Sequence, residues 1–337
     1  MSTSARHGFT LIEVMVSILI FSVMSIAMIG VFSAATSIFR AGESARAATD
    51  EATAVLAMID DDLKRMVAPQ DGGFFFTTVN MPIPGVPPAP VAFVAEPGGN
   101  MVLSFKIRNP DPGAISEAGI GARLIVLYWV EEETLGSGTW ALHRATATAA
   151  DSDNVPATTS ELAVMNSIYR SADSVVARGC LYLGVDLSTP NSVRNSLNWS
   201  MCEPLINMIG VYRYCTEPNA TYPDVQAYPD AFRISLSITG GNRFGAKGTL
   251  ISDDGNGIRV AGVKQVPIIG GAFARIGDPG TPNVEWVRYD NFAKGKMTFQ
   301  GADVVRDLRR TTHTGAHPRG LAVYFCPTFT LVRTLPR

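Results

Sequence analysis

The sequence predicts an α+β fold, in which one long N-terminal helix precedes a mostly antiparallel β-sheet domain. The first observation is an apolar segment, residues 9–39, in which Glu13 is the only charged residue. The second is a stretch rich in alanine and other good helix formers, residues 40–68. The third is a series of short apolar runs, separated by glycine and proline, after Pro69. Few helical periods follow Pro69, so we expect the helix and the sheet to be segregated along the chain.

The apolar segment is long enough to cross a membrane. Residues 14–39 carry no charge, and as a helix they would extend about 39 Å at roughly 1.5 Å per residue. The hydrocarbon core of a bilayer is about 30 Å thick, so this segment can span it with some tilt. A secretory signal has a shorter apolar core, a plain membrane anchor leaves Glu13 unexplained, and a buried core helix rarely runs this long without a charge. We therefore expect one membrane-spanning helix.

The leader and the start of the helix form a motif. A short polar leader ends in Arg6-His7-Gly8, and Phe9 opens the apolar segment with Glu13 four residues further on. This spacing resembles the prepilin motif of type IV pilins and type II secretion pseudopilins. The resemblance implies that a prepilin peptidase cleaves after Gly8 and that the new N-terminal Phe9 is methylated. Arg6 gives the leader the positive charge expected on the cytoplasmic side of the membrane.

The position of Glu13 indicates a specific partner. An acidic side chain inside a span costs on the order of 2.5–3.5 kcal/mol at the helix centre, and less near an end. Cleavage after Gly8 would create an ammonium group on Phe9, one helical turn away and also poorly solvated. In a packed array of such helices, Glu13 can pair with the Phe9 ammonium of a neighbouring subunit. That pairing would drive assembly and fix the axial register, which is the role that the pilin family implies for this glutamate.

The helix is expected to continue beyond the membrane and to end near Ala68, because Pro69 cannot continue it. Apolar residues at three- and four-residue steps predict one stripe that packs on the globular domain: Val55, Met58, Ile59, Leu63 and Met66. Charged residues are expected on the remaining faces: Asp60, Asp61, Asp62, Lys64 and Arg65. The predicted domains are the leader 1–8, the helix 9–68 with a transmembrane half 9–39 and a periplasmic half 40–68, and the periplasmic β-rich domain 69–337.

Several segments after Pro69 are expected to form strands. Residues 103–107 and 232–238 alternate between apolar and polar residues. Residues 124–130 form a continuous apolar run, and a glycine-containing turn separates them from a second run at 140–144, which predicts a hairpin. Further expected strands are residues 211–215, 297–299 and 321–325, and the proline-rich residues 81–90 are expected to form an irregular linker.

Three looser patterns resemble the J-type minor pseudopilin of type II secretion. They are Asp62 near the helix end, a strand with Tyr128 followed by a strand that ends in Leu-x-Arg at Arg144, and a proline-initiated alternating strand at 228–236. The resemblance implies a minor subunit near the tip of a filament. It gives no counterpart for residues 240–317.

Charge and cysteine usage fit an anchored protein that faces an oxidising compartment. The formal net charge is −2, and no basic block occurs outside the leader, so nothing indicates a nucleic-acid partner. All four cysteines follow the expected span, where disulfides are chemically permitted: Cys180, Cys202, Cys215 and Cys326. Cys202 and Cys215 bracket a short segment and are the first choice for a disulfide, with buried thiols as the alternative.

The sequence predicts no catalytic site and no cofactor, because it contains no nucleophile elbow, HExxH motif or P-loop. Weak calcium candidates are Asp253, Asp254 and Asn256, with an ordinary hairpin turn as the alternative. His313 and His317 would share a helix face as metal ligands do, yet nearby glycine and proline favour a loop.

The expected function is that of a structural, non-enzymatic filament subunit. It would be a single-pass inner-membrane protein with a periplasmic C-terminal domain, later assembled into a type II secretion pseudopilus near its tip. Its partners would be other minor and major subunits, the prepilin peptidase and the inner-membrane assembly platform. Two alternatives are open: a minor pilin for adhesion, motility or DNA uptake, and a binding module displayed on a pilin-like stalk.

Overall fold

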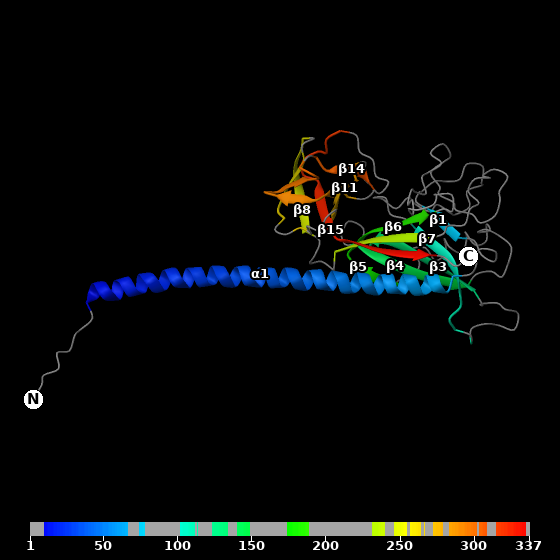
Figure 1. Ribbon diagram of the computed structural model, residues 1–337, viewed down its shortest axis with the longest axis horizontal. Helices are drawn as coiled ribbons and strands as arrows, with labels where there is room; N and C mark the ends of the chain where they lie inside the picture. Colours follow the sequence, from blue (N-terminus) through cyan, green and yellow to red (C-terminus); the bar gives the residue numbers. More distant parts are fainter. Residues whose placement is uncertain are drawn as a thin grey trace, which may run out of the picture. The chain divides into compact units, whose positions relative to one another are not determined.

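The computed structural model has one long helix, α1, followed by strands in three antiparallel sheets (Figure 1). The α+β class predicted from the sequence is therefore confirmed. Two compact units divide the chain, Met1–Arg46 and Ala47–Arg337. The residues that the structure describes are 10–66, 74–77, 102–111, 113, 123–133, 140–148, 174–188, 231–239, 246–254, 257–263, 266, 272–278, 283–301, 303–308 and 315–334.

Helix α1 spans Leu11–Lys64. A reciprocal pair of contacts closes its first turn: Thr10 Oγ1 accepts from the Glu13 amide at 3.4 Å, and Glu13 Oε2 accepts from the Thr10 amide at 3.5 Å. This arrangement is a capping box, which satisfies backbone donors that a helix N-terminus otherwise leaves without partners.

The helix ends earlier than the sequence predicted. Arg65 forms a turn and Met66 a β-bridge to Ile107, so the expected end near Ala68 is wrong by a few residues. The Arg108 amide donates to the Arg65 carbonyl at 2.9 Å. The chain therefore leaves the helix because its backbone pairs with a strand, before Pro69 is reached.

Two sheets pack with the second half of α1. A five-stranded sheet has the order β1-β2-β3-β4-β5 and comprises β1 (Phe74–Thr77), β2 (Val102–Arg108), β3 (Arg123–Glu132), β4 (Trp140–Thr148) and β5 (Val175–Arg178). A three-stranded sheet has the order β16-β7-β6 and comprises β6 (Cys180–Ser188), β7 (Ala231–Ile238) and β16 (Thr328–Thr334). The strands expected at 103–107, 124–130, 140–144 and 232–238 are all present, and β3 pairs with β4 as the predicted hairpin requires.

An eight-stranded sheet forms the rest of the described β structure, in the order β12-β13-β9-β8-β15-β10-β11-β14. Its strands are β8 (Ala246–Asp253), β9 (Ile258–Ala261), β10 (Ala272–Ile276), β11 (Glu285–Tyr289), β12 (Asn291–Ala293), β13 (Lys296–Thr298), β14 (Val305–Leu308) and β15 (Ala322–Cys326). Residues 240–317, for which the family resemblance gave no counterpart, thus supply seven of these eight strands. The strands expected at 297–299 and 321–325 correspond to β13 and β15, whereas those at 211–215 and the linker at 81–90 lie outside the described residues.

Two apolar cores occupy opposite faces of the eight-stranded sheet. One core lies between this sheet's Trp286 and Tyr324, the two smaller sheets and the helix. The other lies on the far face and contains Tyr289 and Phe325, whose rings meet edge to face at 5.7 Å. Buried apolar residues from α1 join the first core: Ala52, Val55, Ile59 and Leu63.

Candidate functional site: the apolar helix surface and the helix clamp

The N-terminal part of α1 presents an uncovered apolar surface. Residues Leu11–Arg40 are long and apolar enough to cross a membrane, and the most apolar window within them is not buried at all. Phe21 is 73 % exposed and Phe32 63 % exposed. Contiguous apolar surface of this extent is rare on soluble proteins. The segment therefore needs lipid or other apolar helices around it.

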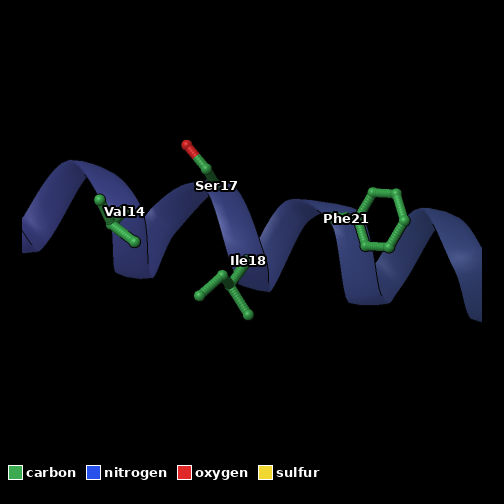
Figure 2. Close-up of a pocket in the computed structure, with 4 residues that line it drawn as sticks. All are labelled: Val14, Ser17, Ile18 and Phe21. Atoms are coloured by element: carbon green, nitrogen blue, oxygen red, sulfur yellow. The ribbon is translucent and has the colours of Figure 1, made fainter.

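Hydroxyl side chains in this segment bond to the helix backbone. Ser17 Oγ donates to the Glu13 carbonyl at 2.7 Å, and Thr36 Oγ1 donates to the Phe32 carbonyl at 2.9 Å. Such back-bonding satisfies the hydroxyl donors without water. A shallow hollow on the same stretch is lined by Val14, Ser17, Ile18 and Phe21 (Figure 2). One helix supplies all four lining residues, so a neighbouring helix or lipid chain would be needed to enclose it.

Glu13 is the one ionisable residue on the uncovered surface before Arg40. It lies in the first turn of α1, where a negative charge interacts favourably with the helix dipole. Its contact with the Thr10 amide, at 3.5 Å, is long for a hydrogen bond. The carboxylate can therefore exchange this contact for a cationic partner at little cost. Gly8 and Phe9 lie outside the described residues, so cleavage and methylation there stay predictions.

At its other end, α1 is fastened to the five-stranded sheet by three polar side chains, which we call the helix clamp: the buried Asp62 and Tyr128 and the partly buried Arg144. Arg144 Nε donates to Asp62 Oδ2 at 2.9 Å, and Arg144 Nη2 donates to Asp62 Oδ1 at 3.1 Å. The Tyr128 hydroxyl also donates to Asp62 Oδ2. A bidentate pair of this kind is stronger and more directional than a single ion contact.

Burial and charge raise the pKa values of two members of the helix clamp, Tyr128 and Arg144. Burial, followed by the Asp62 carboxylate, raises the pKa of the Tyr128 hydroxyl, so it remains a donor. Burial alone would lower the pKa of Arg144, but its bonds to Asp62 outweigh burial and raise the pKa. Asp62 is only 3 % exposed. The arrangement can therefore hold the helix against the sheet.

The burial of Asp62 corrects the sequence prediction, which placed it on a charged outer face. Each buried position on the helix lies three or four residues after an earlier one: Ala48, Ala52, Val55 and Ile59, and then both Asp62 and Leu63. Asp62 lies three residues after Ile59 and thus falls on the stripe. Extending the period past the apolar residues would have identified it, since a carboxylate on a buried stripe requires a partner.

Two further polar contacts link α1 to the sheets, a hydrogen bond and an ion pair, and both lie near the surface. Glu51 Oε1 accepts from the Arg178 amide at 2.9 Å, and Arg333 Nη1 lies 3.4 Å from Asp60 Oδ1. Exposed ion pairs contribute about 0–1 kcal/mol each. The helix clamp and the apolar stripe therefore carry most of the attachment.

The calcium candidates are placed in two different environments. Arg306 binds Asp253 with Nη1, at 3.2 Å, and Nη2, and the His317 amide donates to Asp253 at 2.9 Å. Burial alone would raise the pKa of Asp253, but these bonds lower it below its ordinary value. Asp254 is exposed and Asn256 lies outside the described residues. A cation at Asp253 would thus have to displace a guanidinium, and the pairing of β8 with β9 fits the hairpin alternative.

Some of the histidine and cysteine candidates are buried, and the others lie outside the described residues. His317 is buried with its Nε2 atom 2.6 Å from Glu285 Oε2, while His313 lies outside the described residues. Within the part of the chain that the structure describes, no three His, Cys, Asp or Glu side chains are placed to hold a metal ion. Cys180 and Cys326 are buried thiols rather than halves of a disulfide. The expected pair Cys202 and Cys215 lies outside the described residues.

Comparison with known proteins supports the N-terminal motif. Residues 3–29 match the family described as Prokaryotic N-terminal methylation motif. No curated protein and no solved structure gave a significant match. The match covers the leader and the first part of α1, and does not extend to the β domain. The chain is therefore pilin-like or pseudopilin-like at its N-terminus, where the motif is followed by a helix able to cross a membrane.

Proposed function

We propose that this chain is a minor pseudopilin-type structural subunit of a type II secretion pseudopilus, located near the tip. The observation that carries the proposal is a methylation motif at residues 3–29 that leads directly into a helix whose apolar surface is exposed among the residues that the structure describes. Such a surface is stable in lipid before assembly and among neighbouring helices afterwards. The role is structural, and cleavage and methylation are performed on the chain by other proteins.

In this proposal a prepilin peptidase cleaves after Gly8, Phe9 is methylated, and Glu13 pairs with the Phe9 ammonium of the adjacent subunit. The weak local contact of Glu13 and the internal bonding of nearby hydroxyls support this role. The inner-membrane assembly platform and the other minor and major subunits are the proposed partners.

Two observations support a minor, tip-proximal position. The unit Ala47–Arg337 carries three sheets, and a domain of this size repeated along a thin filament would crowd. The J-type pattern residues Asp62, Tyr128 and Arg144, which are far apart in the sequence, meet in the helix clamp. Retention of Glu13 argues against the first tip position, because the resemblance implies a subunit without this acid there.

The deciding experiment compares a strain that lacks this chain with its parent. The secreted proteins are identified by mass spectrometry, and surface filaments are counted in the same cultures. Lost secretion with intact filaments supports the pseudopilus. Lost filaments with normal secretion would make the chain a minor pilin, and no change in either would make the β domain a displayed binding module.

A Glu13→Ala variant tests the assembly contact. We expect leader cleavage to proceed and incorporation into filaments to fall by at least about tenfold, because an ammonium group in an apolar array is left without its carboxylate. The readouts are the mobility shift on leader removal and the amount of chain in sheared filaments. Glu43→Ala, an exposed acid on the same helix, is the matched control and should assemble normally. Normal incorporation of the Glu13 variant would remove the role we give this residue.

A further inference from the structure

Arg275 is fully buried where the eight-stranded sheet meets the five-stranded sheet. It comes from β10 and pairs across the sheet with Tyr324 of β15. The carbon at the centre of its guanidinium lies 4.7 Å from the Tyr324 ring centroid and 5.1 Å from that of Trp140, the first residue of β4. Two aromatic rings from two different sheets therefore contact one guanidinium, and each attracts it through its π electrons.

The guanidinium makes no hydrogen bond. Its Nε, Nη1 and Nη2 atoms are all buried without an acceptor. Asp278, on the same side of the sheet, accepts instead from the Tyr324 hydroxyl at 2.8 Å. A guanidinium carries five N–H donors, and aromatic faces do not satisfy donors that point along its edges. Closing this junction therefore removes water from an ion and gives it no acceptor in return.

Two other partly buried arginines behave differently. Arg144 bonds the Asp62 carboxylate in the helix clamp, and Arg306 bonds Asp253, Asp303 and Glu285. Both therefore exchange water for carboxylates when the protein folds. Among these three arginines, Arg275 alone has no hydrogen-bond acceptor on its guanidinium, and it lies at the contact between two sheets. Burial lowers the pKa of Arg275, although Tyr324 and Asp278 favour its charged form.

We propose that this junction is a joint that opens while each sheet stays folded, with Arg275 as the residue that favours opening. Hydration of its guanidinium restores the hydrogen bonds that the closed state lacks, whereas stacking on Trp140 and packing of Tyr182 on Trp286 favour closure. The open state exposes the face of β15 that carries Tyr324 and Cys326. This device is independent of the filament role proposed above.

The test measures how often the buried Cys326 thiol becomes accessible. The full-length chain in detergent is treated with a thiol-alkylating reagent, and the rate at Cys326 is followed by peptide mass spectrometry at several low urea concentrations. The variants are Arg275→Met, Arg275→Lys and Arg288→Met. Arg288 is the matched control, because it lies on β11 of the same sheet, is exposed, and stacks on Phe299 at 5.2 Å.

The proposal predicts the direction in which each substitution changes the rate of Cys326 alkylation. Methionine fills a similar space between the rings without a charge, so Arg275→Met should slow alkylation of Cys326 by about tenfold. Arg275→Lys keeps a charge, so its rate of Cys326 alkylation should stay within about threefold of the wild-type rate. Arg288→Met should show the wild-type rate. The wild-type rate should depend only weakly on urea, since a local opening exposes little surface.

Two results would overturn the proposal. Faster or unchanged alkylation in Arg275→Met would mean that the arginine fastens the junction or does not affect it. A wild-type rate that rises with urea as steeply as global unfolding would mean that the thiol is reached only when the whole unit unfolds. The second result requires no variant, so the test stands even if Arg275→Met fails to fold.

Discussion

At the scale of single residues, buried charge is either matched by a bonded partner or left without one. In the helix clamp, one carboxylate receives three donors from two side chains. On the eight-stranded sheet, Arg306 donates hydrogen bonds to the carboxylates of Asp253, Asp303 and Glu285. Removing one partner from such a cluster costs more than the pair contributes, because the remaining charge stays buried.

We expect Arg144→Ala to lower the free energy of unfolding of the β domain by about 3–5 kcal/mol, because Asp62 remains buried without its cation. Tyr128→Phe should cost only about 1–2 kcal/mol, since it removes the hydroxyl's hydrogen bonds with Asp62 and Arg144 but keeps the ion pair. Urea unfolding checks both values. Lys64→Ala breaks the exposed pair with Asp60 and should cost less than about 0.5 kcal/mol. Equal losses in Arg144→Ala and Lys64→Ala would contradict this account.

Acid should weaken the eight-stranded sheet through Asp253. Its pKa is lowered in the folded chain, so its stabilising contribution is complete above the unfolded pKa of about 3.9 and is lost as the pH falls through the folded value. Unfolding midpoints at pH 7 and below pH 4 measure this loss. Asp253→Asn should be less stable at pH 7 and should lose less stability on acidification than the wild type.

At the scale of elements, sequence patterns were reliable wherever the determinants were local. Residues 232–238 alternate between apolar and polar residues, and β7 forms there, with Ile234, Leu236 and Ile238 buried in the core. The order of the eight-stranded sheet could not be predicted, because β15 pairs with both β8 and β10, far away in the sequence. Asp62 was assigned to solvent because a charged residue interrupts an apolar pattern, and Arg275 was missed because no strand was predicted at residues 272–276.

A glycine substitution in β6 tests how tightly that strand packs. A Cβ atom at Gly184 would lie 2.2 Å from the Tyr182 hydroxyl, so the Tyr182 ring would have to move. We expect Gly184→Ala to reduce the free energy of unfolding by about 1–3 kcal/mol, as overpacking does. Gly42→Ala is the control, because nothing lies within 4 Å of its Cβ position and alanine favours a helix by about 0.5–1 kcal/mol. A loss of the same size in both variants would exclude the clash as the cause.

At the scale of the whole molecule, α1 belongs to two environments. Its first part is uncovered and apolar, whereas residues after Ala47 belong to the compact unit that holds the sheets. The N-terminal motif could be recognised from sequence because a few fixed positions define it. The sequence also predicted two halves of α1, residues 9–39 and 40–68, but it could not predict every side chain that the sheets cover, such as that of Asp62.

A chain that starts at Ala47 should fold as a soluble domain, whereas one that starts after Met66 should not. The longer chain keeps Val55, Ile59 and Leu63, whose burial contributes about 1.5–3 kcal/mol each, against a typical total of about 5–15 kcal/mol. The shorter chain also leaves Arg144 without Asp62. Soluble yield and a cooperative thermal transition are the measurements. A folded shorter chain would show that the helix is dispensable for the domain.

The three-stranded sheet cannot be completed until the last strand of the chain, β16, has been synthesised. Its neighbours are β6, synthesised before it, and β16, whose residues Thr328–Thr334 leave the ribosome almost a hundred residues later. Until then one edge of β7 stays unpaired, and such edges recruit other strands. A nascent chain paused before β16 is thus the species most exposed to aggregation, and a chaperone would have to shield it longest at β7.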